Sequence, residues 1–188
     1  MLPLPLSHIM DPTLLALGRL PARANLRPQD PNQSESKWRR DLNGVWRFQL
    51  IEAPDQAPDA WMDAATEGSA WRDINVPGVW TRQNTGDLPH YANWQMPFAC
   101  AKPPAVPAEN PTGLYRLDID LEADWQSRQT VLHLGGFESL ALVWCNGVFV
   151  GMAKDSRLPS EFDLSATTQV GTNQLAIMVV RWCDATWI

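Results

Sequence analysis

The stretch at residues 139–152, SLALVWCNGVFVGM, decides the fold class of this chain. Two apolar runs flank Asn146-Gly147, and an Asn-Gly pair between two such runs predicts a β-hairpin closed by a two-residue type I′ turn. Both central residues of that turn take positive φ, which Asn and Gly tolerate best. The sequence therefore predicts antiparallel β-structure around this turn.

Similar short runs lie on both sides of the hairpin. Residues 114–121, LYRLDIDL, alternate apolar and polar side chains, as a strand with one buried face does. Further strands are expected at 45–51, 74–76, 130–134, 160–164 and 173–182. Short strands separated by turn residues at intervals of about 8–12 residues predict an all-β sandwich. Only two short helical stretches are expected, at 14–17 and 55–63.

Two segments follow neither the strand period nor the helix period. Residues 1–40 are interrupted by prolines and are expected to form an extended N-terminal arm, which needs a partner surface to be ordered. Residues 77–111 hold seven prolines but also many aromatic side chains. A loop of this length is usually functional or disordered, and its aromatic content favours an ordered loop pressed against another surface. The sandwich domain is expected to span residues 41–188.

Composition excludes some classes of function. The chain has 188 residues, with 15 Lys and Arg against 21 Asp and Glu, and a net charge of −6. Nucleic acid is not expected as a partner, because phosphate binding needs clustered cations. A membrane span is not expected either, because no apolar run reaches about 18 residues. Of the 10 tryptophans, roughly two-thirds are expected in the core and the others could stack on sugar rings.

The cysteines and the N-terminus favour a reduced, cytoplasmic setting. The three cysteines are an odd number without the spacing of a metal site. Cys145 and Cys183 lie in apolar runs, where small buried thiols are common. The first ten residues lack the basic start of a secretory signal.

The groups able to do chemistry do not form an evident catalytic set. Glu161 and Asp163 alternate in the run SEFDL and share one face of a strand, so a solvated face or a turn-capping role is expected rather than the carboxylate pair of a glycosidase. In the turn Asp155-Ser156-Arg157, Arg157 is expected to be a buried brace between strands rather than a ligand contact. The histidines are too scattered for a metal site: His8, His90 and His133.

Several motifs, taken in chain order, carry a resemblance to a known family. They are Leu42-Asn43-Gly44 with Trp46-Arg47-Phe48, ENPTG at 109–113, WCNG at 144–147, DSRLPSEFDLS at 155–165, and Arg181-Trp182. Over roughly residues 10–188 the chain resembles the N-terminal sugar-binding domain of large microbial β-galactosidases of glycoside hydrolase family 2. Residues 18–24, GRLPARA, are similar to the N-terminal arm of those enzymes.

The resemblance implies a fold and a reaction. The fold is a jelly-roll β-sandwich of the galactose-binding-domain-like kind, followed in the family by an immunoglobulin-like domain and a TIM barrel. The reaction is retaining hydrolysis of terminal non-reducing β-D-galactosides, such as lactose, through a galactosyl-enzyme intermediate. The two catalytic glutamates belong to the barrel, so no catalytic residue is expected here and the chain alone is expected to be inactive. The family's sugar- and sodium-binding Asp is expected beyond Ile188, and Asp184 is not that residue.

The resemblance also implies one substrate-binding residue, Asn93. It lies in PHYANW at 89–94, matching the tip of a loop that reaches into the active site of the barrel, where an Asn amide bonds a galactosyl hydroxyl. An amide suits this contact because it both donates and accepts while staying neutral. Ala92 and Trp94 depart from the family's usual Thr and Val. No cofactor is expected in this chain, although the resemblance implies magnesium and sodium ions in the whole enzyme.

The expected partners are the other domains of the enzyme and further copies of it, with residues 1–40 supporting the oligomer. An alternative from another class is a stand-alone carbohydrate-binding module, which the sandwich and the tryptophans favour. The loop 77–111 argues against it, because a free module would expose an aromatic patch. Another specificity within the family, such as glucuronidase, is disfavoured only by the resemblance around Asn93.

Overall fold

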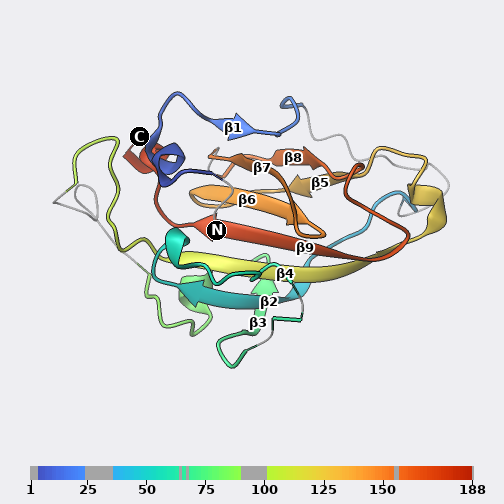
Figure 1. Ribbon diagram of the computed structural model, residues 1–188, viewed down its shortest axis with the longest axis horizontal. Coiled ribbons are helices and arrows are strands. Elements are labelled where there is room, and N and C mark those ends of the chain that lie inside the picture. The colour runs from blue at the N-terminus through green and yellow to red at the C-terminus, as the bar shows by residue number, and fades with distance from the viewer. Residues whose placement is uncertain are drawn as a thin grey trace.

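A computed structural model describes residues 4–23, 36–63, 65–66, 68–89, 101–154 and 157–187. Nine strands form within these ranges (Figure 1), namely β1 Ala16–Leu17, β2 Gly44–Ile51, β3 Arg72–Val76, β4 Thr112–Leu121, β5 Val131–Leu134, β6 Leu140–Cys145, β7 Val148–Ala153, β8 Ser160–Asp163 and β9 Gly171–Val180. The helices are short 3₁₀ turns, namely η1 Leu6–Met10, η2 Pro54–Gln56, η3 Trp80–Arg82, η4 Ala123–Trp125 and η5 Asp184–Trp187. None of these described helices has the length and apolar character needed to cross a membrane.

The strands pair into two antiparallel sheets. The larger has seven strands in the order β1-β7-β6-β9-β4-β2-β3, and β5 pairs with β8 in the smaller one. The longest pairing in the larger sheet joins β4 to β9 over ten residues each, from Thr112 opposite Val180 to Leu121 opposite Gly171. The predicted all-β antiparallel sandwich is confirmed, and each strand expected from the sequence is present with its ends shifted by at most two residues.

The hairpin that predicted the fold forms as expected. Asn146 and Gly147 connect β6 to β7 with φ values of 51° and 76°. The Asn146 amide also donates to Asn173 Oδ1 at 2.8 Å, and Gln174 N donates to Asn146 Oδ1 at 2.8 Å. The turn residue therefore tethers the hairpin to the neighbouring strand β9 as well as closing it.

The two faces of the large sheet are covered differently. On one face Phe48, Val143 and Ile177 pack with Leu132 and Phe162 of the β5–β8 pair. The other face is covered mainly by irregular segments, whose buried side chains are Ile9, Trp61, Trp71 and Cys183. Five of the nine described tryptophans are buried, somewhat fewer than the two-thirds expected. The large sheet is therefore covered by a strand pair on one face and by irregular chain on the other.

Neither expected helical stretch forms. At 14–17, Ala16 and Leu17 instead make β1, because β7 offers an open edge to pair with. At 55–63 only the end of the turn η2 forms, since Pro58 interrupts the segment and Ala60 takes a φ of 54°. That path places the Trp61 ring edge-on to Trp144, with ring centroids 5.2 Å apart. Tertiary contacts decide both local structures.

The described part of the arm lies on the sandwich. β1 borders β7, and the next residues bridge to β8 through Arg19 opposite Phe162, so the arm joins the edges of both sheets. The approach is so close that a Cβ on Gly18 would overlap the Val150 carbonyl oxygen. The surface that orders these residues is thus supplied by the chain itself.

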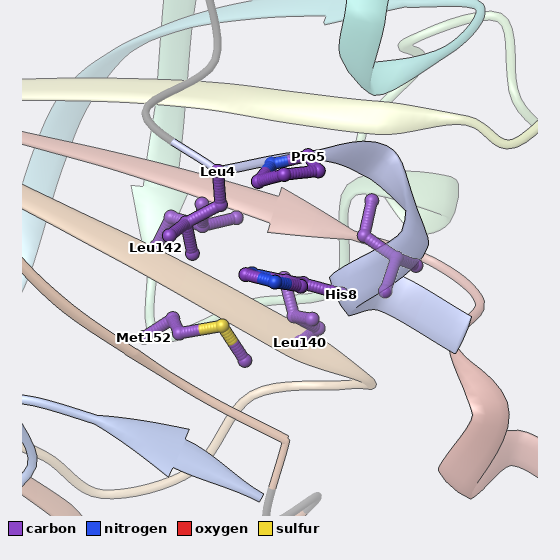
Figure 2. A pocket seen from close by; sticks show the side chains of 7 residues that line it. Leu4, Pro5, His8, Leu140, Leu142 and Met152 are labelled. Atoms are coloured by element: carbon purple, nitrogen blue, oxygen red, sulfur yellow. The ribbon is translucent and has the colours of Figure 1, made fainter. Parts of the chain in front are cut away.

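The first turn of the arm covers β6 and β7. Figure 2 shows the His8 ring of η1 directed toward Met152 and Leu140. The small hollow between them is lined by Leu4, Pro5, His8, Ile9, Leu140, Leu142 and Met152. With one polar ring among its lining residues, it has the character of a packing seam rather than of a sugar site.

Candidate functional site

The site that the sequence predicts is carried by the loop at 77–111, of which residues 77–89 and 101–111 are described. We call these two segments the first foot and the second foot. Asn93 and the aromatic residues around it lie outside the described residues. The described geometry of the loop is therefore that of its two feet and of the elements that hold them.

The first foot is bound together by side-chain hydrogen bonds. The Gln83 amide pairs with both backbone groups of Asn75 in β3, at 2.9 and 3.0 Å. The buried Trp80 donates from Nε1 to Asp87 Oδ2 at 2.7 Å, and Thr85 Oγ1 donates to the Trp80 carbonyl at 3.0 Å. Residues 75–87 thus form a compact turn beside the outer edge of β3.

A sheltered ion pair holds the end of this foot to the residue that follows β9. Arg181 Nη1 lies 2.6 and 2.5 Å from the two carboxylate oxygens of Asp87, and Nη2 lies 3.4 Å from the Leu88 carbonyl oxygen. The two charged side chains are 14% and 12% exposed. Because the Asp87 carboxylate also accepts from Trp80, its position is fixed from two directions.

The second foot is held by the same C-terminal segment. The buried Asn110 donates from Nδ2 to the Trp182 carbonyl at 2.8 Å and accepts from the Trp182 N–H at 3.0 Å. Trp187 Nε1 donates to the Ala105 carbonyl at 2.9 Å. Figure 1 shows residues 101–111 and η5 at the same end of the molecule. Both feet therefore end on residues 181–187.

Asp163 caps a turn by accepting from the Ser165 N–H, as expected, whereas the mostly buried Glu161 side chain lies in an ion pair rather than on a solvated face. Glu161 accepts both guanidinium hydrogen bonds of Arg23, at 2.6 and 3.0 Å, and lies 3.1 Å from His133 Nδ1. The bond from Arg23, and then that from His133, lowers the pKa of Glu161. Bonds from Ser165 and Gln129 lower the pKa of Asp163. A general acid needs a raised pKa, so neither group is suited to that role.

The expectation for Arg157 is wrong. Its side chain is 77% exposed and pairs with Glu138 at 2.7 Å instead of bracing buried strands. The backbone explains the difference, because Arg157 takes a φ of 67° in a turn and donates its N–H to the Phe137 carbonyl. The turn is tied by its backbone, and the guanidinium points to solvent.

The residue that does brace the interior, Lys154, was not identified from the sequence. Its fully buried Nζ lies 2.6 Å from Asp184 Oδ1 and donates to the Asp11 carbonyl at 2.9 Å. It joins the arm, the end of β7 and η5. Asp184 is therefore occupied within the fold. A lone Lys directly after an apolar strand was the only available sign, and its partners are far away in sequence.

The other reactive groups are unavailable or dispersed. Cys145 and Cys183 are buried free thiols, as predicted, and burial raises the pKa of each. Within the described ranges no three His, Cys, Asp or Glu side chains come together as a metal site would require.

Comparison with known proteins is specific at the level of the family. A family model for the sugar binding domain of glycosyl hydrolases family 2 matches residues 39–188. The β-galactosidase of Psychromonas ingrahamii is 46% identical over 153 residues, which cover 81% of this chain and 15% of that protein. A β-galactosidase of Enterobacter cloacae is 40% identical over 184 residues, covering 95% and 18%. The chain thus spans under a fifth of the length of these curated relatives.

Solved structures support the fold. A β-glucuronidase from an uncultured Clostridium species superposes with a TM-score of 0.56 at 20% identity, covering 74% of this chain and 21% of that one. The Bifidobacterium dentium β-glucuronidase gives the same TM-score at 24% identity, with coverages of 74% and 19%. At such identities the likeness concerns the fold alone.

Proposed function

This chain belongs to glycoside hydrolase family 2, and from that premise we propose that it serves as the sugar-binding domain of a retaining β-galactosidase. The observation that carries the proposal is its 40–46% identity to β-galactosidases over most of its length. The substrates would be terminal β-D-galactosides such as lactose. Cleavage would proceed through a galactosyl-enzyme intermediate on glutamates outside these 188 residues.

The proposed contribution of this chain is to present one loop to the galactosyl unit. Asn93 would donate to and accept from a sugar hydroxyl. The anchored feet of the loop support this role, because Asp87 and Asn110 are each held by short hydrogen bonds to one segment. The domain thus acts on substrate as a scaffold and supplies no proton or nucleophile.

The remaining proposals concern the whole enzyme. We place it in the cytoplasm, which the free thiols of Cys145 and Cys183 support. Magnesium and sodium ions would lie in other parts of it, and we assign no described residue to them. We further propose assembly with further copies through residues 1–40.

The stand-alone module is the alternative, and binding by this chain alone distinguishes the two. A scaffold whose catalytic partners are missing should show no galactoside binding by calorimetry, yet should restore hydrolysis when mixed with the remainder of a matching enzyme. Millimolar or tighter binding by the chain alone, without restored hydrolysis, would favour the module.

The role of Asn93 is testable in the complete enzyme. Asn93→Ala should raise the barrier to galactoside hydrolysis by about 1–3 kcal/mol, the usual cost of leaving a buried hydrogen-bonding group without its partner. The measurement is kcat/KM with a nitrophenyl galactoside. Asn43→Ala, at an exposed Asn before β2, serves as the matched control and should leave kcat/KM unchanged. An unchanged kcat/KM for Asn93→Ala would remove this residue from the substrate site.

A further inference from the structure

We propose that Asp87 and Arg181 are positioning residues for sugar binding, acting through the loop between the two feet. This inference rests on the proposed function and deepens it. The two residues belong to a set that we call the loop clamp, made of Asp87, Asn110, Arg181, Trp182 and Trp187.

The clamp is built on the most firmly held part of the fold. Strand β9 lies between β6 and β4 in the middle of the large sheet and pairs with both of them. Arg181 follows its last residue directly, and its N–H donates to the Pro111 carbonyl at 3.1 Å. The guanidinium is therefore attached to a fixed backbone position. Its two short contacts hold the Asp87 carboxylate in place.

The two sides of the clamp use different chemistry. At the second foot, Asn110 bonds the backbone of Trp182 much as a neighbouring strand would, which fixes the chain without using charge. At the first foot, the anchor is a guanidinium on a carboxylate, with a tryptophan N–H on the same carboxylate. A charge-assisted hydrogen bond is roughly twice as strong as a neutral one, and the arginine fork adds orientation. The ion pair is thus suited to fixing the direction in which the chain leaves Asp87.

The position of the pair indicates a role in placement more than in folding. Neither Asp87 nor Arg181 belongs to the two buried clusters that hold the sheets together. Asp87 is the last described position of the first foot with a side-chain bond, and residues 90–100 follow soon after it. Trp80 of the first cluster also donates to Asp87, so Asp87→Asn, which keeps an acceptor for Trp80, weakens the ion pair with the smallest disturbance of the cores.

Loss of the pair should weaken substrate binding. Chain whose ends are fixed loses less conformational freedom when a ligand binds to it, and pre-organisation of this kind raises affinity. The contact to the non-reacting sugar hydroxyl is made in both the ground state and the transition state. Its weakening should therefore raise KM and leave kcat nearly unchanged.

The experiment measures kcat and KM of the complete enzyme with a nitrophenyl galactoside. Asp87→Asn keeps the size of the side chain and an acceptor for Trp80, and Arg181→Leu removes the cation. For each, KM should rise about tenfold while kcat stays within about twofold. Arg181→Lys, which keeps the charge without the fork, should give an intermediate KM. The matched control is Arg23→Leu, which removes a two-bond arginine–carboxylate pair from the arm and should leave KM unchanged.

Two results would overturn the inference. One is a KM within about twofold of wild type for folded Asp87→Asn and Arg181→Leu. The other is an equal loss of kcat and kcat/KM, which would assign the pair to the transition state. If Arg181→Leu does not fold, Asp87→Asn decides alone. If the wild-type enzyme does not hydrolyse galactosides, the proposed function fails, and the same variants are judged on the glycoside that it does hydrolyse.

Discussion

The arm and the loop look alike in sequence but are held in different ways. Both are long, proline-rich segments without a helix or strand period. The described arm is attached by backbone pairing and by a buried lysine, through β1 on β7 and Lys154 on the Asp11 carbonyl. The feet of the loop are attached by side-chain hydrogen bonds, above all those of Asp87 and Asn110. Changes in the arm should therefore cost stability, whereas changes at the feet should mainly affect substrate binding.

The largest expected effect lies on the arm side, at Lys154. Lys154→Met should lower the free energy of unfolding of this chain by about 3–5 kcal/mol, because it leaves a buried Asp184 carboxylate and the Asp11 carbonyl without their cation. Urea unfolding followed by tryptophan fluorescence measures the change.

A second variant separates the charge from the packing. Lys154→Met combined with Asp184→Leu removes both charges, and apolar replacement of a buried pair is often neutral. The double variant should regain most of the lost stability. A single variant as stable as the wild type would show that the arm does not depend on this pair.

An intermediate effect is expected at the loop, where the Asn110 side chain makes the two backbone hydrogen bonds that a paired strand would make. Asn110→Ala removes the partners of both the N–H and the carbonyl of Trp182 and should destabilise the chain by about 1–3 kcal/mol. In the complete enzyme KM should rise as well, which Lys154→Met should not produce. A stability loss without any change in KM would place Asn110 with the arm rather than with the loop, and would weaken the contrast between the two regions.

Local rules recover the parts of this fold that depend on neighbouring residues. Asn146-Gly147 predicts its own turn because both φ values are a property of those two residues. Ala16–Leu17 could not be recognised as a strand, because its pairing partner on β7 lies more than a hundred residues away. The same holds for the contact between Asn110 and Trp182, which are 72 residues apart. Both residues belong to motifs that were recognised in the sequence, but the motifs do not show that the two residues are in contact.

The site divides along the same line. The resemblance supplied Asn93 because an amide in a matching motif can be located without coordinates. The clamp was missed because Asp87 looks like an ordinary turn residue, and only the fold brings Arg181 to within 2.6 Å of it. Arg157 shows the converse error, since a specific motif led to an expectation of burial where the side chain is exposed. A motif identifies residues, whereas their partners depend on tertiary structure.

The smallest expected effect is again on the arm, at the exposed pair of Arg23 with Glu161. The hydrogen bond from Arg23 is the main reason that the pKa of Glu161 is lowered. A carboxylate with a lowered pKa stabilises the fold above the ordinary glutamate pKa of about 4.3, and this contribution is lost as the pH falls through its lower value in the folded chain. Because Arg23 is 59% exposed, water screens the pair and its contribution to stability should be small. Glu161→Gln should therefore be slightly less stable than wild type in urea at neutral pH, and the difference should shrink as the pH falls below the ordinary glutamate value and wild-type Glu161 becomes protonated. A difference that stays the same on acidification would mean that the pair stabilises the arm through its packing and not through the charge of Glu161.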